Sequence, residues 1–348
     1  MKAVESLVNK SLAVKYRPTH FSDMVEQNLI VTILENICNN ELYNRNFLFL
    51  GSAGCGKTTL ARIIGRQLNG GEDYAIEIDA ASHGGVEDVR DLVIQAQSYP
   101  VIGDYKIFIV DEAHCVSPAG WSSFLKVLEE QPAKSIFVFC TTNPEKIPAT
   151  IISRVQTFQL SKISTQGIYD RLIHVFNSEI AEGRKLEYKY DAVMFIAKLA
   201  NGGLRAALTD CDKCLAFSNK ISMENITQAL NLPNYDDYFL LLMAIAKKNN
   251  VQITEIIHRV YNSGVNFVNW FEKFHQFVIN IVKFIFMKDI SATMIPSHYL
   301  EKIQKYNESH SILCLRLANK LIKLNSELKY TTYQQELALT YLCSINNK

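Results

Sequence analysis

The sequence predicts an α/β protein in which a parallel β-sheet flanked by helices is followed by helical domains. Between residues 1 and 160, short runs rich in β-branched and aromatic residues alternate with stretches of helical apolar spacing. Strands separated by helices form parallel sheets that are covered on both faces. Fourteen of the fifteen glycines and seven of the eight prolines lie at or before Pro233. The remaining residues have apolar side chains three and four apart, which indicates a helical bundle.

Five strands are expected in the α/β part. They are FLFL (47–50), YAIEID (74–79), KIFIVD (106–111), SIFVFCTT (135–142) and VQTFQL (155–160). The patterns of residues 161–230 are helical again. We therefore predict three domains, which are an α/β domain (1–160), a small helical domain (161–232) and a C-terminal all-α domain (233–348).

Composition excludes several classes of protein. Apolar residues make up 48% of the chain and charged residues 20%, a balance that excludes a disordered chain. The formal charge of +1 is not that of a strongly basic nucleic-acid binder, so any DNA contact must be local or shared with partners. The longest apolar run, from Tyr238 to Ala246, is far shorter than the ~20 residues that span a bilayer. Eight scattered cysteines indicate reduced thiols, and we expect a cytoplasmic protein.

The segment from Gly51 to Thr58, GSAGCGKT, fits the pattern G-x-x-x-x-G-K-[ST] in full. It follows a predicted strand and opens a helical stretch, which is the context in which this loop binds phosphate. The glycines let backbone N–H groups surround a phosphate, and the helix N-terminus adds partial positive charge. Lys57 would reach the terminal phosphates, and the Thr58 hydroxyl would bind Mg²⁺.

Polar side chains also end the next predicted strands. Asp111 and Glu112 follow the strand 106–111. Nucleotide hydrolysis needs one carboxylate that holds Mg²⁺ through water, here Asp111, and one that orients and deprotonates the attacking water, here Glu112. The segment 141–144, Thr-Thr-Asn-Pro, ends the following strand and offers hydroxyl and amide groups for the γ-phosphate, although alone it would be a capping turn.

Together these residues resemble the clamp-loader branch of the AAA+ ATPases, nearest the bacterial DNA polymerase III gamma/tau subunits. The matching segments run in order over about two-thirds of the chain. They are LAVKYRPTHFSDMVEQ (12–27), the phosphate loop, DAASHGGVEDVRDL (79–92), VDEAH (110–114), LKVLEEQP (125–132), TTNPEKIPATIISR (141–154) and GGLRAAL (202–208). The resemblance implies an AAA+ ATP-binding domain (1–160), a helical lid (161–232) and, on a looser match, a collar domain (233–348) through which the family's subunits form a ring.

The resemblance implies that the chain uses ATP and Mg²⁺. Arg17 and Pro18 would lie at the adenine end of the nucleotide, and Thr58 and Asp111 would hold the Mg²⁺. The residues implied in binding the phosphates are Gly51, Gly54, Cys55, Gly56, Lys57, Thr58 and Thr59.

The resemblance also implies the catalytic roles. Glu112 would be the catalytic carboxylate, Thr142 the first sensor and Arg205 a second sensor from the same chain. Arg154 would be an arginine finger that serves the ATP of the neighbouring subunit, and Arg90 would contact DNA. Both Arg154 and Arg205 rest on the resemblance alone, because a single arginine is most often a solvated surface residue.

The implied partners are other clamp-loader subunits in a ring that we expect to hold five, a sliding clamp and primer-template DNA, with no membrane. The sequence departs from the family in three places. The eight residues QLNGGEDY (67–74) stand where the bacterial subunit has a four-cysteine zinc module, so we expect no zinc. Val155 replaces the cysteine of the family's Ser-Arg-Cys motif, and Arg90 is the one plainly basic residue in the expected DNA segment. A short chain without zinc and without the long C-terminal extension of the tau form suits a bacteriophage, plasmid or otherwise reduced replication system. We therefore expect the protein in a bacterial or virus-infected bacterial cell.

Three other functions stay open. The chain could be a structural clamp-loader subunit that does not hydrolyse ATP, although the intact phosphate loop and acidic pair argue against this. It could be another AAA+ DNA motor, such as a branch-migration helicase or a helicase loader. The tetrad Asp-Glu-Ala-His (111–114) is also found in a class of helicases, but those need a second motor domain for which residues 235–348 offer no motif.

Overall fold

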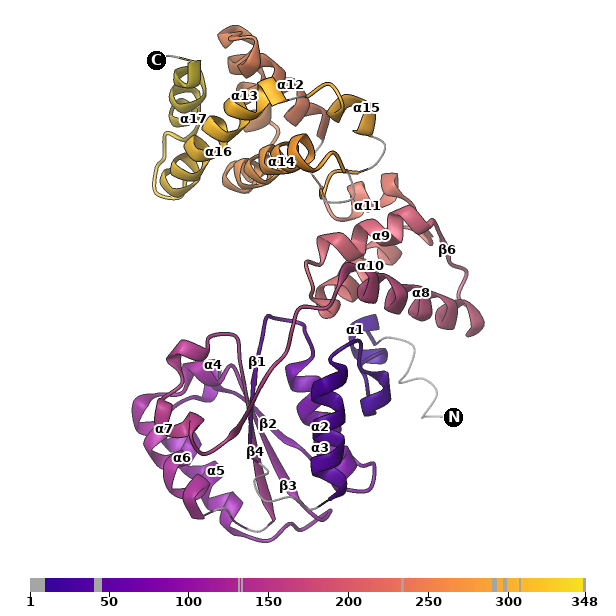
Figure 1. Cartoon of the computed structure of the whole chain (residues 1–348), viewed down its shortest axis with the longest axis vertical. Coiled ribbons are helices and arrows are strands. Elements are labelled where there is room, and N and C mark those ends of the chain that lie inside the picture. Colours follow the sequence, from indigo (N-terminus) through magenta and orange to yellow (C-terminus); the bar gives the residue numbers. More distant parts are fainter. Residues whose placement is uncertain are drawn as a thin grey trace. The chain divides into compact units, whose positions relative to one another are not determined.

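A computed structural model of the chain describes residues 10–40, 46–130, 132, 134–232, 235–289, 293–296, 299–306 and 308–346. The chain divides into two compact units, Met1–Asn225 and Ile226–Lys348. The first unit therefore contains the α/β domain together with most of the predicted small helical domain, and the predicted three-domain boundaries stay a prediction (Figure 1).

The first unit is built on a five-stranded parallel sheet with the strand order β2-β3-β4-β1-β5. The strands are β1 (Phe47–Leu50), β2 (Ile76–Asp79), β3 (Lys106–Asp111), β4 (Ser135–Thr141) and β5 (Gln156–Gln159). Each of the five predicted runs forms one of these strands. Leu50 pairs with Thr141, so β1 and β4 end side by side. Because β4 also pairs with β3, the loops after β1, β3 and β4 meet at one edge of the sheet.

Alternate residues of the strands face two separate cores, as the period of two in a strand requires. Phe47, Ile107 and Val138 belong to the core on the side of α2 (Asn28–Asn39) and α3 (Lys57–Leu68). Leu48, Phe108 and Phe137 belong to the core on the side of α5 (Val86–Gln97) and α6 (Pro118–Glu130). Figure 1 shows the two groups of helices on opposite faces of the sheet. The predicted α/β sheet with helices on both faces is confirmed.

The first unit also contains short elements in its α/β part and a group of helices that follows the sheet. In the α/β part they are α1 (Leu12–Lys15), the 3₁₀ turns η1 (Phe21–Asp23), η2 (Ala113–Cys115) and η3 (Pro144–Lys146), α4 (Ala80–His83) and α7 (Ala149–Ile152). After the sheet come α8 (Thr165–Ala181), β6 (Glu187–Tyr188), α9 (Tyr190–Leu199), α10 (Leu204–Phe217), β7 (Lys220–Ile221) and α11 (Met223–Ala229), which continues into the second unit. The sequence predicted helices alone for residues 161–230, whereas β6 and β7 form a small parallel pair. Two residues are too few for the alternation of a strand to show in the sequence.

The second unit is helical, as predicted. Its elements are α12 (Tyr235–Ala246), α13 (Asn250–Asn262), α14 (Phe267–Met287), α15 (Leu300–Ile303), α16 (Glu308–Leu328), α17 (Gln334–Cys343) and η6 (Ser344–Asn346). Aromatic residues of α12 and α14, such as Tyr238, Trp270 and Phe274, fill its core. Asn266 caps α14 by accepting a hydrogen bond from the Asn269 N–H at 2.9 Å.

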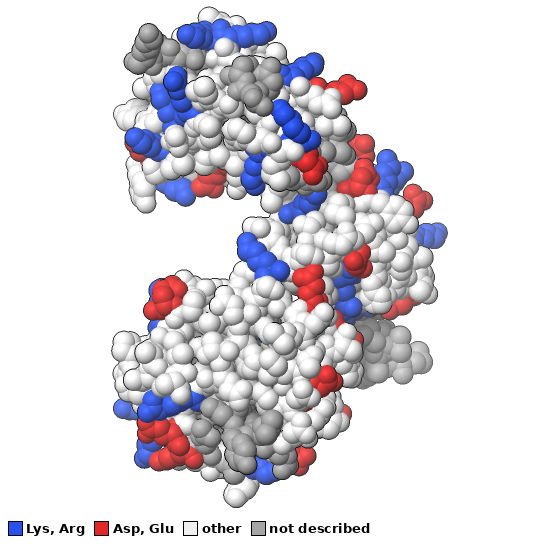
Figure 2. All heavy atoms as spheres, in the orientation of Figure 1, with Lys and Arg blue, Asp and Glu red and all other residues white. Residues whose placement is uncertain are grey.

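The surface of the second unit carries a moderate excess of basic residues, because residues 235–348 contain 13 Lys and Arg against 9 Asp and Glu. Figure 2 shows that the basic side chains on the visible face are spread out and do not gather into one patch. None of the helices within the described residues combines the length and the hydropathy needed to cross a bilayer.

Candidate nucleotide-binding site

The loop between β1 and α3 has the backbone geometry of a phosphate-binding loop. Gly51, Gly54 and Gly56 all have positive φ angles, of 151°, 74° and 109°. A Cβ atom on Gly51 would lie 2.8 Å from the Leu160 carbonyl oxygen, so this position accepts glycine alone. The side chain of Lys57 is buried, and its Nζ donates hydrogen bonds to the carbonyls of Gly51 and Ser52 at 2.9 and 3.0 Å. The ammonium group is thus held against the loop, where it would meet a bound phosphate.

The two predicted Mg²⁺ ligands are already in contact. The Thr58 hydroxyl donates a hydrogen bond to Asp111 Oδ2 at 2.8 Å, and the other carboxylate oxygen of Asp111 accepts from the Glu112 N–H at 3.0 Å. Hydroxyl and carboxylate oxygens are the ligand type that Mg²⁺ binds beside nucleotide phosphates. The buried Ser52 Oγ has no hydrogen-bond partner within the described residues. A preformed ligand pair and an unsatisfied loop hydroxyl both fit a Mg²⁺–nucleotide complex.

Glu112 is held in an unusual conformation beside this pair. Its backbone lies in the left-handed region at φ 47° and ψ 42°, which for a residue other than glycine marks strain that is common at functional sites. Its Oε2 atom is buried without a hydrogen-bond partner among the described residues. This oxygen lies 3.3 Å from His114 Nδ1, which in turn lies 3.1 Å from the Thr141 hydroxyl. A carboxylate oxygen with an unused acceptor can take a proton from water, as the predicted role of Glu112 requires.

The network reaches the end of β4 through Thr141. This residue is fully buried, and its hydroxyl accepts a hydrogen bond from the Asn143 N–H at 3.0 Å. The hydroxyl of Thr142, the predicted first sensor, instead donates to Asn143 Oδ1 at 2.7 Å. The contacts of Thr141 and His114 were not foreseen, because the motifs that contain them say nothing about which side chains meet across strands.

A cavity lies against the phosphate loop and brings together most of the predicted nucleotide-binding residues. Its predicted lining residues are Arg17, Pro18, Gly54, Cys55, Gly56, Lys57, Thr58, Thr59 and Arg205. Seven further residues line it that were not singled out from the sequence. They are Ala13, Tyr16, Met24, Val25, Ile163, Leu204 and Leu208. Six of these seven side chains are apolar, as suits the flat face of a base. The first four lie in the segment 12–27, and the resemblance of that segment to the family is the one sequence feature that could have pointed to them.

The start of α10 rests directly on the phosphate loop. The Leu204 N–H donates a hydrogen bond to the Gly54 carbonyl at 3.2 Å. A Cβ atom on Gly54 would lie 3.2 Å from Gly203 Cα, so the two chain segments approach closely because both positions are glycine. This contact delivers Arg205, which is exposed, to the cavity.

The cavity is electropositive. Burial lowers the pKa of Arg17, and the nearby guanidinium groups of Arg62 and Arg205 lower it further, while Glu77 opposes this effect. The charged residues that line the cavity are Arg17, Lys57 and Arg205, and basic side chains around a cavity favour the binding of an anion. A polyphosphate would satisfy them.

Four cysteines of this unit are buried. Burial raises the pKa of the Cys55 thiol in the phosphate loop and of Cys140 in β4, so neither is a nucleophile. Cys211 and Cys214 are buried in α10, and burial raises the pKa of Cys214 to about 11. Within the described residues, no three His, Cys, Asp or Glu side chains form a group that could hold a metal ion.

Arg154 lies outside the cavity. It follows α7, and its guanidinium donates to Glu129 Oε1 at 3.0 Å and to the Thr150 carbonyl at 2.7 Å. This separation from its own chain's phosphate loop agrees with a role at a neighbouring subunit.

Arg90 is also separate from the cavity, on the exposed face of α5. The segment α4–α5 nevertheless contacts the turn that follows Glu112. A Cβ atom on Gly84 would lie 2.8 Å from the Cys115 carbonyl oxygen, and the Ser117 N–H donates to the Gly84 carbonyl at 3.0 Å.

Several known proteins are similar in sequence to this chain. Residues 72–164 match the family model described as DNA polymerase III, delta subunit. The chain is 31% identical over 317 residues to the DNA polymerase III subunit gamma/tau of Mycoplasma genitalium, a match covering 83% of this chain and 52% of that protein. It is 34% identical to the subunit tau of Bacillus subtilis over 59% of this chain and 39% of that one. It is 28% identical to the subunit gamma of Buchnera aphidicola subsp. Schizaphis graminum over 89% of this chain and 90% of that one.

Over most of its length the chain is thus similar in sequence to DNA polymerase III gamma and tau subunits. It spans about half the length of the first relatives that it matches and nearly all of the Buchnera gamma subunit. A solved structure of the Thermotoga maritima RuvB Holliday junction branch migration motor matches with a TM-score of 0.52 and 17% identity, over 66% of this chain and 79% of that one. At this identity the likeness shows the fold alone.

Proposed function

We propose that this chain is an ATP-hydrolysing subunit of a DNA replication clamp loader, which opens a sliding clamp and loads it onto primed DNA. The observation that carries the proposal is the single cavity lined by Lys57, Arg17 and Arg205, with the Thr58–Asp111 pair at the phosphate loop. The segments that contain Arg17, Lys57 and Arg205 are far apart in the sequence but line the same cavity.

Each group around the cavity has a chemical task in this proposal. The backbone N–H groups of the loop and the Lys57 ammonium bind the phosphates, while Thr58 and Asp111 hold Mg²⁺, which supplies positive charge beside the β- and γ-phosphates. Glu112 accepts a proton from the attacking water through its unsatisfied oxygen. Thr142, directly after β4, and Arg205, in α10, sense the γ-phosphate.

The partners follow from the same proposal. The helical domain (233–348) joins the chain to other clamp-loader subunits in a ring of five, in which Arg154 reaches the ATP of a neighbour. Arg90 and its counterparts in the ring contact the backbone of primer-template DNA, and the ring binds a sliding clamp in the bacterial cytoplasm. The chain needs no zinc.

Two of the alternatives from the sequence can be compared with the structure, and both are less well supported. A branch migration motor is favoured by fold likeness alone, whereas the sequence similarity over most of the chain is to gamma and tau subunits. A structural subunit without hydrolysis has no use for the Thr58–Asp111 pair or for the strained Glu112.

The test is the variant Lys57→Ala. Loss of a buried charged donor to phosphate removes about 1.5–3 kcal/mol of binding, or roughly tenfold to a hundredfold in ATP affinity. Hydrolysis should be abolished, while circular dichroism and melting should show an intact fold. The matched control is Lys126→Ala, which removes an exposed lysine of α6. Wild-type ATPase activity in the Lys57 variant would contradict the proposed site.

A further inference from the structure

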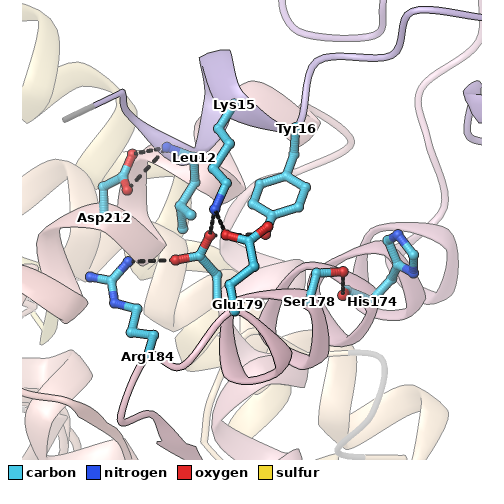
Figure 3. Close-up of polar contacts among 9 residues, drawn as sticks. Leu12, Lys15, Tyr16, His174, Ser178, Glu179, Arg184 and Asp212 are labelled. Atoms are coloured by element: carbon cyan, nitrogen blue, oxygen red, sulfur yellow. Dashed lines mark hydrogen bonds and ion pairs between the residues drawn. The ribbon is translucent and has the colours of Figure 1, made fainter. Parts of the chain in front are cut away.

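The segment before the adenine end of the cavity is tied to the helices that follow the sheet. Lys15 Nζ donates a hydrogen bond to Glu179 Oε1 at 2.6 Å, and the Tyr16 hydroxyl donates to the same oxygen at 2.9 Å. The Leu12 N–H donates to both carboxylate oxygens of Asp212, at 3.2 and 3.0 Å. Figure 3 shows Lys15 and Tyr16 directed at Glu179 of α8, with Asp212 of α10 beside Leu12. Residues about 165 to 200 apart in the sequence thus form one junction.

Glu179 is the centre of this junction. It is 6% exposed, and its second oxygen accepts a hydrogen bond from Arg184 at 2.9 Å. Burial alone would raise the pKa of Glu179, but the hydrogen bonds from Lys15, Arg184 and Tyr16 outweigh burial and lower the pKa. Burial and the bond to Glu179 raise the pKa of Tyr16 to about 12. The junction is therefore an ionised carboxylate surrounded by three donors, which is a geometry that tolerates little displacement.

The residues that the junction holds lead straight into the cavity. Tyr16, Arg17 and Pro18 all line the cavity, and Arg171 of α8 donates a hydrogen bond to the Tyr16 carbonyl at 3.2 Å. From the opposite side, α10 contributes Arg205 to the same cavity.

The junction therefore fixes the segment at the base end of the cavity to α8 and α10. Of these two helices, α10 also contributes Arg205 to the cavity. We propose that Glu179 is a positioning residue for the nucleotide base, because it holds the segment 15–18 against α8. The inference rests on the proposed function, since it requires that the cavity takes a nucleotide.

The proposal concerns the binding of the base and not that of the phosphates, so the test measures the two separately. The full-length chain is titrated with ADP and with inorganic tripolyphosphate, each with Mg²⁺. ADP uses both ends of the cavity, whereas tripolyphosphate uses the phosphate loop alone. Glu179→Gln and Lys15→Met should each weaken ADP binding by about tenfold, as expected when one partner of a buried charged hydrogen bond is lost. Binding of tripolyphosphate should stay as in the wild type.

Two controls define the contact. Lys15→Arg keeps a cationic donor within reach of Glu179 and should restore most of the ADP affinity. Glu182→Gln removes the second, exposed carboxylate that pairs with Lys15 and should behave as the wild type. If Glu179→Gln does not fold, the two Lys15 variants still decide.

Three results would overturn the inference. Unchanged ADP affinity in Glu179→Gln and Lys15→Met would show that the junction does not position the base site. Equal losses for ADP and tripolyphosphate would show a structural role alone. A wild-type chain that binds ADP no better than tripolyphosphate would overturn the proposed nucleotide site itself, and the inference with it.

Discussion

Replacement of Gly54 by alanine should push the start of α10 away from the phosphate loop. Gly54 has φ +74°, and an alanine in this region costs about 1–2 kcal/mol of the free energy of unfolding. The new Cβ would lie 3.2 Å from Gly203 Cα and 3.5 Å from the Arg205 backbone nitrogen. Because both are backbone atoms, the start of α10 must move. The Leu204–Gly54 hydrogen bond, with a net value of about 0.5–1.5 kcal/mol, would weaken.

The control is Gly70→Ala. Gly70 has a similar φ of +66°, and a Cβ atom there would meet nothing within 4 Å. Both variants should therefore lose a similar backbone strain energy, and Gly54→Ala should lose the hydrogen-bond contribution in addition. Thermal melting of the full chain measures the total loss in each variant. Gly54→Ala alone should also lose about tenfold in affinity for fluorescent ADP, since it displaces Arg205 and one wall of the cavity. Equal ADP affinities in the two variants would refute the view that the Gly54 contact positions α10.

Two further predictions concern residues outside the cavity. Chains carrying Arg154→Ala or Lys57→Ala should each lose stimulated ATP hydrolysis, yet mixed complexes should recover part of it, because an arginine acting in trans serves a neighbour's intact loop. Mixtures that assemble without recovery would contradict a finger in trans. Arg90→Ala should weaken binding of the assembled complex to primed DNA of any sequence and lower the salt slope by roughly one counterion per contact. An unchanged slope would place the DNA contact on other residues.

The sheet could be predicted from the sequence because its signals are local. The runs 47–50 and 106–111 coincide with β1 and β3, since buried parallel strands are continuous apolar segments with polar residues at their ends. Strand order could not be predicted from these runs. Nothing local in FLFL says that β1 lies between β4 and β5.

The candidate site was predictable to the same extent. The phosphate loop and Asp111 are recognised by spacing, and the structure brings Thr58 and Asp111 into contact. The hydrogen bonds between Lys15 and Glu179 and between His114 and Thr141 could not be predicted, because these residue pairs belong to no motif with a characteristic spacing. Such contacts depend on tertiary packing, which the motifs do not encode.

The close approach of Gly84 to Cys115 has a practical consequence. All eight cysteines lie within the described residues, and Cys115 is the exposed one. Cys115 is three positions after Glu112, and its backbone carbonyl lies against Gly84, in the segment that carries Arg90. A maleimide dye added to the natural chain should therefore attach first at Cys115, and its emission would record how the α4–α5 segment and the turn after Glu112 move together, without any engineered residue.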